Sequence, residues 1–153
     1  YVVAASGYLQ NPELIGHGYA PLKEGVIHGD KISWRFIAPD VHDFSWAADP
    51  DFVHDFRDIE NGPRMHFFYK RDSEYVDLWK DFQPNAAKFL SFFSEKIGKY
   101  PYAQYSVIMA GDGGMEYAMC TFIDGVGQDT PDNQQLIADA LLLIDDKSTI
   151  PYV

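Results

Sequence analysis

The spacing of the apolar residues changes once along the chain, from every second position to every third or fourth. In KISWRFIAP, residues 31–39, Ile32, Trp34 and Phe36 alternate with polar side chains, which predicts a half-buried β-strand. Between residues 84 and 98 the apolar spacing is helical instead. This stripe consists of Ala86, Phe89, Leu90, Phe93 and Ile97. The two periods together predict an α+β chain whose β-rich part comes first.

Other segments complete this picture. Further strands are predicted in HDFSWAAD (42–49), DFVHDFRDI (51–59), RMHFFYK (64–70), YSVIMA (105–110) and MEYAMCTFI (115–123). NGP at 61–63 is a turn signal, and Pro84 either starts the helix or kinks an earlier turn that contains Trp79. One strand over 115–123 would place these side chains on one face: Met115, Tyr117, Met119 and Thr121.

The C-terminal part is predicted to hold a second helix. Thr130 can cap it with Pro131 at its first position. Its apolar stripe would be Leu136, Ile137, Ala140, Leu141 and Ile144. The change from β to mixed character between about residues 59 and 72 predicts a division into residues 1–62 and residues 63–153.

Composition and charge exclude several classes of partner. The chain of 153 residues is 46% hydrophobic and 16% aromatic, which is enough for a packed core and argues against disorder. Its net charge of −11 argues against nucleic-acid and anionic-membrane partners and favours cationic ligands. No apolar run is long enough to span a membrane. The N-terminus lacks a methionine and a basic region, so we expect an excised or processed piece of a longer protein.

The segment GDGGMEYAM, residues 111–119, holds the strongest candidate site. Its glycines would let another backbone approach closely, and a peptide could add to the following strand through main-chain hydrogen bonds. A carboxylate at the end of that strand, Glu116, could then pair with the peptide's terminal ammonium. The alternative is a tight turn in which Glu116 is solvated or forms a salt bridge.

The same segment resembles the G-x-M-E-N exopeptidase motif of the M1 family of zinc aminopeptidases, in the GGMEY form of its bacterial members. APDVHDFSWAADPDF resembles the strands that enter the catalytic domain of that family. FFSEKIGKYPYAQYSVIMAGDGGMEY resembles the helix and strand that lead to its motif. The resemblance covers about residues 1–125. It implies that residues 1–62 end an N-terminal β domain and that residues 63–153 begin a thermolysin-like catalytic domain.

The resemblance also implies roles for single residues. Glu116 matches the glutamate that binds the free α-amine of the substrate. Gly113, Gly114 and Met115 match the backbone that lines the peptide, whereas Tyr117 replaces the asparagine of the common motif. We therefore expect a peptide N-terminus as the partner of the intact enzyme, with no nucleic acid and no membrane.

The catalytic metal site of the family has no counterpart in this chain. An M1 enzyme holds zinc through HExxH, and no histidine here stands in that motif; the five are His17, His28, His42, His54 and His66. We therefore expect no catalytic residue, no metal ligand and no bound cofactor in this chain, while an intact relative would use zinc. The predicted function is a substrate-anchoring fragment of a zinc aminopeptidase that is itself inactive.

The sequence offers other, weaker candidates for functional residues. His42–Asp43 and His54–Asp55 could be metal ligands, but structural or solvated roles are favoured because neighbours in a strand point to opposite faces. A cluster of acidic residues could bind calcium, although a solvated acidic surface is favoured. Its members are Asp49, Asp51, Asp55 and Asp58. Cys120 is predicted to be buried rather than nucleophilic.

Two other function classes stay open. Trp34, Trp46 and Trp79 with the tyrosines could form a sugar platform, which would make the chain a non-catalytic binding module for carbohydrate or peptide. The chain could also be a purely structural piece with an inert motif. As an excised piece it would expose an apolar patch and self-associate through it.

Overall fold

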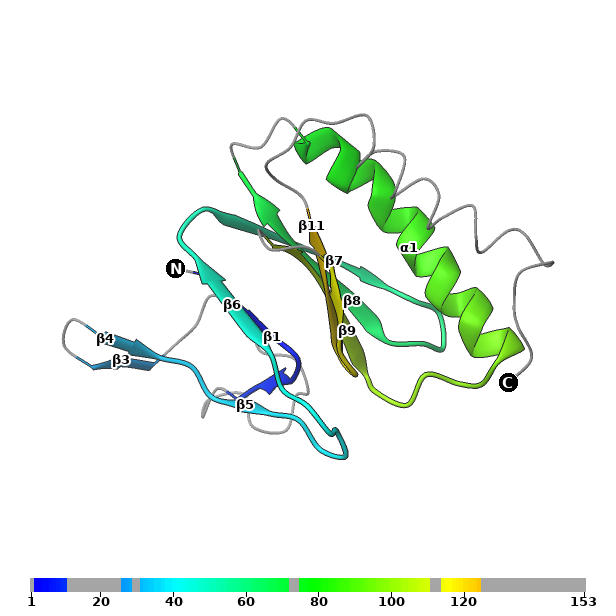
Figure 1. The fold of residues 1–153 in the computed structure, drawn as a ribbon, viewed down its shortest axis with the longest axis horizontal. Helices are drawn as coiled ribbons and strands as arrows, with labels where there is room; N and C mark the ends of the chain where they lie inside the picture. The colour runs from blue at the N-terminus through cyan, green and yellow to red at the C-terminus, as the bar shows by residue number, and fades with distance from the viewer. Residues whose placement is uncertain (1, 11–25, 29–30, 72–74, 111–113, 125–153) are drawn as a thin grey trace.

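The structure, a computed structural model, describes residues 2–10, 26–28, 31–71, 75–110 and 114–124. Its largest part is a five-stranded mixed sheet with the strand order β10-β11-β9-β8-β7. The strands are β7 (Phe52–Asp58), β8 (Arg64–Lys70), β9 (Gln104–Ala110), β10 (Met115–Glu116) and β11 (Cys120–Asp124). Helix α1 (Val76–Lys96) lies along one face of this sheet (Figure 1). The predicted α+β class is confirmed at this level.

The order β8-α1-β9 explains how the helix comes to cover the sheet. β8 and β9 are parallel, with Phe67 opposite Val107. Parallel neighbours need a long crossover, and α1 is that crossover. β11 continues the parallel set beside β9, whereas β7 and β10 are antiparallel to their neighbours. The two antiparallel strands therefore form the two edges of the sheet.

Strand β8, an interior strand of the sheet, is buried on both faces, which accounts for its nearly continuous apolar sequence. Met65, Phe67 and Tyr69 pack with Trp79 in the core beneath α1. Phe68 points to the opposite face and joins a second core. The buried members of that core are Val2, Ala4, Leu9, Phe52, Phe68, Ile108 and Cys120. The sheet is thus the middle layer between a helix and a set of short strands.

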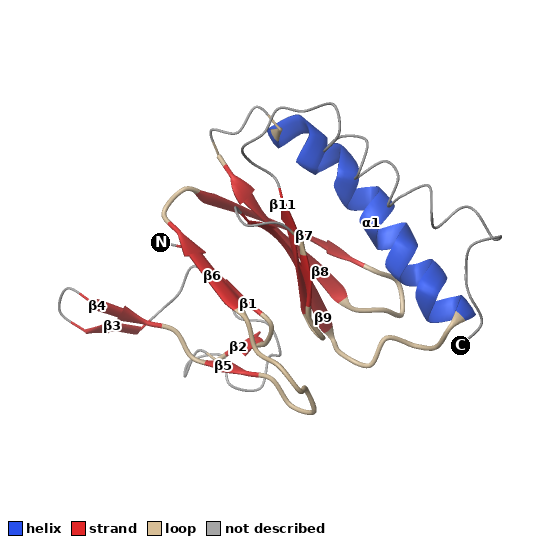
Figure 2. Cartoon of the chain, in the orientation of Figure 1, coloured by secondary structure: helices blue, strands red, loops and turns tan. Residues whose placement is uncertain are grey.

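Those short strands form three antiparallel pairs, drawn in red beside the main sheet in Figure 2. They are β1 (Val2–Ala5) with β6 (Trp46–Asp49), β2 (Tyr8–Leu9) with β5 (Phe36–Ile37), and β3 (Val26–His28) with β4 (Lys31–Ser33). Two hydrogen bonds join the start of β2 to the start of β9. Gln104 Nε2 donates to the carbonyl of Gly7 at 2.6 Å, and the amide of Ala103 donates to the Tyr8 hydroxyl at 2.9 Å.

Helix α1 begins at Val76, so Pro84 does not start it; the earlier turn that contains Trp79, the predicted alternative, belongs to the helix. Pro84 lies inside the helix, where it lacks an N–H and costs about 3 kcal/mol. Burial of Trp79 against Tyr69, with ring centroids 5.7 Å apart, offsets that cost and draws the preceding turns into the helix. The predicted stripe is only partly correct, because Ile97 at its end is 77% exposed.

The predicted strand over 31–39 is wrong as one element, because it consists of two. β4 pairs with β3, and β5 pairs with β2. The chain changes partners at Trp34 and Arg35, so one straight ladder cannot include both halves. Arg35 accepts a hydrogen bond from the amide of Gln10 at 2.7 Å as the second pairing begins.

The predicted turn at 61–63 is confirmed and joins β7 to β8. Asn61 has a φ of 57°, a left-handed conformation that asparagine tolerates well. The amide of Gly62 closes the turn on the carbonyl of Ile59 at 3.0 Å. β7 and β8 lie on either side of the predicted division at 62–63 and pair as a hairpin; the division stays a prediction.

The helix predicted after Thr130 lies outside the described residues. Within the described ranges, no helix has the length and apolar character needed to cross a bilayer.

Candidate functional site

The strand that carries Glu116 lies at the outer edge of the sheet. β10 pairs on one side with β11, with Met115 opposite Phe122 and Glu116 opposite Thr121. In the described part of the chain no strand pairs with its other side. Gly114, Met115 and Glu116 are all exposed, Met115 by 49%. Within the described residues, the edge is therefore open to an added strand.

The predicted single strand over 115–123 is wrong, because the chain reverses within it. The amide of Tyr117 donates to the carbonyl of Cys120 at 2.8 Å, and Ala118 and Met119 form the bend between them. The reversal places Cys120 and Phe122 in the core beside β9, which one straight strand could not do. Glu116 therefore shares a face with Thr121, and the strand ends directly after it.

The hairpin geometry determines where the backbone groups of Glu116 point. Residues of an antiparallel pair alternate between hydrogen-bonded and non-hydrogen-bonded positions. Tyr117 is hydrogen-bonded to Cys120, so the next pair, Glu116 with Thr121, is the non-bonded kind. The N–H and C=O of Glu116 consequently point away from β11, toward the open edge. They are the groups that an added peptide strand would bind.

The bend after Glu116 is fixed from three directions. The Tyr100 hydroxyl donates to the carbonyl of Ala118 at 3.0 Å, and the amide of Ser106 donates to the carbonyl of Met119 at 3.0 Å. The amide of Ala118 donates to Asp43 Oδ1 at 3.5 Å. These contacts come from the loop before β9, from β9 itself and from the loop before β6. They hold the end of β10 in one position.

The structure brings three of the five predicted site residues to this edge. They are Gly114, Met115 and Glu116. Gly113 lies outside the described residues. Tyr117 is half-buried, and its ring packs edge-on against Phe122 at a centroid distance of 5.5 Å. A methyl group added at Gly114 would meet the Phe122 carbonyl at an ordinary 3.6 Å, so the chain itself does not require glycine there.

The histidine–aspartate pairs do not assemble a metal site in the described residues. His42 Nε2 lies 3.2 Å from Asp43 Oδ2 on an exposed loop. His54 Nε2 lies 2.9 Å from Nδ1 of His66, and the two rings are stacked. Among the described residues no group of three or more His, Cys, Asp or Glu side chains could hold a metal ion.

The acidic residues of the calcium candidate point to separate partners. Asp49 forms an ion pair with Lys70 at 2.9 Å, and Asp58 forms one with Arg64 at 2.6 Å. Hydrogen bonding to these cations lowers the pKa of both carboxyl groups. Asp55 accepts the Tyr69 hydroxyl instead. These three carboxylates therefore do not converge on one cation.

The tryptophans lie in different environments. Trp79 of α1 is buried against the sheet, Trp34 is partly buried against the core on the other face of the sheet, and Trp46 is 64% exposed. They do not form one flat surface. The alternative of a carbohydrate-binding module stays a prediction.

Cys120 is buried, as predicted. Its side chain is 0% exposed, and its Sγ lies 3.0 Å from Ser45 Oγ. Burial raises the pKa of the thiol to about 11, so the nucleophilic thiolate is scarce at neutral pH. The arrangement is that of a packing residue.

Sequence reasoning missed one partly buried pair of histidines. His54 and His66 come from β7 and β8, and His54 also stacks on Phe68 with centroids 4.7 Å apart. Burial lowers the pKa of His66 to about 3, with the charge of His54 as a further cause. The signal was present in the sequence, because a hairpin closed at 61–63 brings residues 54 and 66 onto one face.

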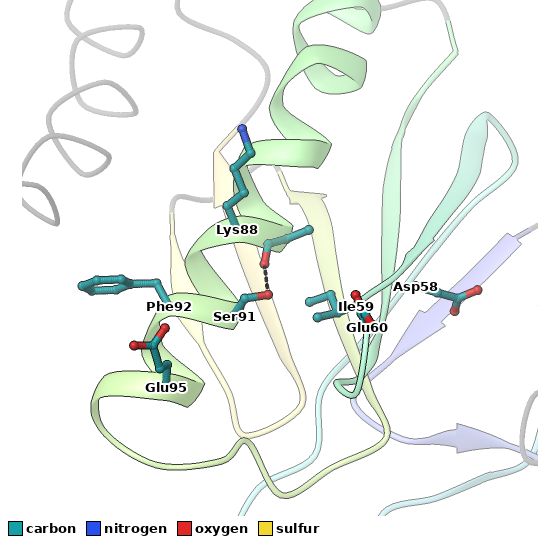
Figure 3. Close-up of a pocket in the computed structure, with 8 residues that line it drawn as sticks. Asp58, Ile59, Glu60, Lys88, Ser91, Phe92 and Glu95 are labelled. Atoms are coloured by element: carbon teal, nitrogen blue, oxygen red, sulfur yellow. Dashed lines mark hydrogen bonds between the residues drawn. The ribbon is translucent and has the colours of Figure 1, made fainter.

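A shallow groove lies between α1 and the β7–β8 turn (Figure 3). Its volume is about 400 Å³, and Ile59 points into it toward Ser91. The Ser91 hydroxyl is already bound to the carbonyl of Ala87 at 3.0 Å. Two of the acidic side chains around the groove, Asp58 and Glu95, form ion pairs with neighbouring cations. The groove therefore offers less defined chemistry than the edge of β10.

Comparison of the sequence with models of known protein families gave no match, and comparison with curated proteins gave none either.

Proposed function

We propose that this chain binds the N-terminal residues of a peptide along the open edge of β10 and that Glu116 pairs with the peptide's α-ammonium. The observation that carries the proposal is the position of Glu116 on an exposed edge strand that stops directly after it. A peptide strand added to β10 would find its main-chain partners at Gly114 and Glu116. It could not continue past the bend, so its free end would meet the Glu116 carboxylate.

Several features support recognition of a charged amine rather than of an extended peptide in general. The bend at Ala118 and Met119 is held by hydrogen bonds from Tyr100 and Ser106, so the end of the strand is preorganised. Glu116 is exposed and can accept charge-assisted hydrogen bonds. The net charge of −11 favours approach of a cation, although screening limits this effect beyond about 8 Å at physiological salt.

On the resemblance to the M1 zinc aminopeptidases, we propose that this role belongs to an enzyme that removes N-terminal residues. In that proposal the sheet with α1 is the first part of a thermolysin-like domain. β10 would hold the substrate while zinc-dependent hydrolysis uses groups that this chain does not provide. The described residues do not fit a zinc ion, because His54 and His66 bind each other and the acidic side chains at Asp49 and Asp58 bind cations.

A titration with two peptides tests the anchoring role. Leucyl-glycyl-glycinamide with a free amine and its N-acetylated form differ in the charge at the N-terminus. We expect the free peptide to bind more tightly and to shift the backbone amide signals of Gly114 and Glu116 in nitrogen-15 NMR spectra. Equal binding, or shifts confined to the groove beside α1, would contradict the proposal.

Activity of the chain on its own is a separate test. We expect no cleavage of a fluorogenic aminoacyl substrate and no stoichiometric zinc after purification. Stoichiometric zinc together with activity that is lost on chelation would show that the chain is more than an anchoring part.

A further inference from the structure

Strand β7 forms the edge of the sheet opposite to β10. In the described part of the chain no strand pairs with its outer side. Phe56 is 53% exposed, and Arg57 and Asp58 are exposed as well. β7 has seven residues, whereas β10 has two. An exposed edge of this length is a template for pairing with another strand.

Two hydrogen bonds with the chain around β8 show which backbone groups of β7 point outward. The amide of Arg71 donates to the carbonyl of Asp51 at 3.0 Å, and the amide of Ile59 donates to the carbonyl of Pro63 at 3.2 Å. Hydrogen-bonded positions alternate along an antiparallel pair, so the odd-numbered residues from 51 to 59 are bonded across the hairpin. The N–H and C=O groups of the even-numbered residues therefore point to the outer side. These residues are Phe52, His54, Phe56 and Asp58.

The side chains of β7 divide between the two faces of the sheet. Asp55 accepts from Gln83 of α1 at 3.0 Å, so the odd-numbered residues face the helix. Phe56 lies on the opposite face, where the Arg64 guanidinium lies 4.4 Å from the centre of its ring. A strand added to β7 would therefore meet the charges of Asp55 and Arg57 on one face and an aromatic ring on the other.

We propose that β7 pairs with β7 of a second copy of this chain, antiparallel and with the twofold axis at Phe56. In this register the two Phe56 residues lie opposite each other, and their outward N–H and C=O groups exchange two hydrogen bonds. Asp55 lies opposite Arg57 of the second copy, and symmetry makes this pair occur twice. A register centred on Asp55 would instead place two carboxylates directly opposite, which is unfavourable. The charges along β7 are thus complementary to themselves.

Both members of the charged pair can take a further partner. The hydrogen bonds to Asp55 from Tyr69 and Gln83 both end at Oδ2, and a carboxylate offers about four acceptor sites. Arg57 donates to Gln83 through Nε, and its two terminal nitrogens carry the other donors of the guanidinium. In the proposed register Asp55 and Arg57 form a pair of the non-hydrogen-bonded kind, in which opposed side chains are closest.

This dimer is independent of the proposed function. It would join two five-stranded sheets into one and leave the candidate peptide site accessible, because β10 lies at the other edge. The net charge of −11 opposes association, but salt screens that repulsion beyond about 8 Å, whereas Asp55 and Arg57 would be in contact. Pairing along one strand gives a small interface, so we expect a weak dimer.

Sedimentation velocity over a series of concentrations, at physiological salt, measures the association. The wild-type chain should pass from monomer to dimer. Arg57→Glu places a carboxylate opposite Asp55 at both symmetry-related positions, so the dissociation constant should rise by about tenfold or more. Lys99→Glu is the matched control, because it makes the same change of charge at an exposed residue outside β7. Far-UV circular dichroism checks that both variants fold.

Cysteine cross-linking tests the register separately. In Phe56→Cys the two new thiols would lie on directly opposed residues, whose Cα atoms are about 5.5 Å apart and within reach of a disulfide. In Glu60→Cys they would be more than about 20 Å apart. With oxidised glutathione as the oxidant, we expect a disulfide-linked dimer in Phe56→Cys and little in Glu60→Cys. The native thiol of Cys120 is 0% exposed and should not take part.

Three results would overturn the proposal. One is a wild-type chain that stays monomeric at every concentration, even if a synthetic peptide with the sequence of residues 51–59 binds to β7, since the edge would then take an extended peptide instead of a second copy. Another is equal weakening of the association by Arg57→Glu and Lys99→Glu. The third is equal cross-linking in the two cysteine variants, which would place the contact between copies elsewhere. None of these results bears on Glu116, which the peptide titration tests by itself.

Discussion

Tyr69 donates its phenolic hydrogen to Asp55 across the β7–β8 pair, with 2.5 Å between the two oxygens. Gln83 of α1 donates to the same Asp55 oxygen at 3.0 Å and accepts from Arg57 Nε at 3.2 Å. Burial raises the pKa of Tyr69, and the hydrogen bond to Asp55 adds to the rise. One carboxylate thus joins both strands to the helix.

The variant Tyr69→Phe is expected to lower the free energy of unfolding by about 1–3 kcal/mol, because Asp55 loses a donor in a partly buried position. Urea denaturation measures the change. Tyr102→Phe removes an exposed hydroxyl and should change the stability by no more than about 0.5 kcal/mol. Similar losses in the two variants would show that the Tyr69–Asp55 contact does not join the helix to the sheet.

Stability should fall as the pH drops below about 6.5, the ordinary pKa of histidine. The folded-state pKa of His66 is lowered to about 3, chiefly by burial, so the unfolded chain binds a proton there that the folded chain does not. The loss amounts to at most about 1.4 kcal/mol per pH unit for this residue. It begins near pH 6.5 and continues toward pH 3.

Denaturation at pH 7.5 and pH 5.5 tests this assignment, because the carboxyl groups titrate little in that interval. His66→Gln should be less stable than the wild type at both values but should show a smaller difference between them. An unchanged difference would mean that another group carries the pH dependence.

Cys120 should react slowly with iodoacetamide at pH 8 in the folded chain and rapidly in urea. The side chain is 0% exposed, and burial raises its pKa to about 11, so access and ionisation both oppose the reaction. Mass spectrometry of the labelled protein gives the two rates. Fast labelling of the folded chain would contradict the packing role and would make the thiol a candidate nucleophile again.

The sequence predicted which helices and strands form better than it predicted where each begins and ends. The strand RMHFFYK and the turn at 61–63 were found correctly, because apolar pattern and turn residues act locally. The start of α1 stayed open between Pro84 and an earlier turn because proline disfavours a helix interior, whereas packing of Trp79 against Tyr69 overrides that preference. Such long-range contacts are not visible in local patterns.

The candidate site, too, could be predicted only in part from the sequence. The candidate edge and Glu116 could be identified from the glycines and the lone carboxylate of residues 111–119. The hairpin within 115–123 could not, since MEYAMCTFI has no glycine, proline or asparagine at the bend. The reversal depends on burial of Cys120 and Phe122 beside β9, and on hydrogen bonds from Tyr100 and Ser106. The pairing of Glu116 with Thr121 could therefore not be predicted from the sequence.

The most direct test of the central claim compares Glu116→Gln with Glu60→Gln. Both variants remove one exposed carboxylate from an acidic chain, but Glu60 lies in the β7–β8 turn, far along the sheet from β10. The measurement is the ratio of the dissociation constants for acetylated and free leucyl-glycyl-glycinamide. The account predicts that Glu60→Gln keeps the wild-type preference for the free amine, whereas Glu116→Gln reduces it by about tenfold, as for one charge-assisted hydrogen bond. A preference that survives in Glu116→Gln, or that falls equally in both variants, would contradict it.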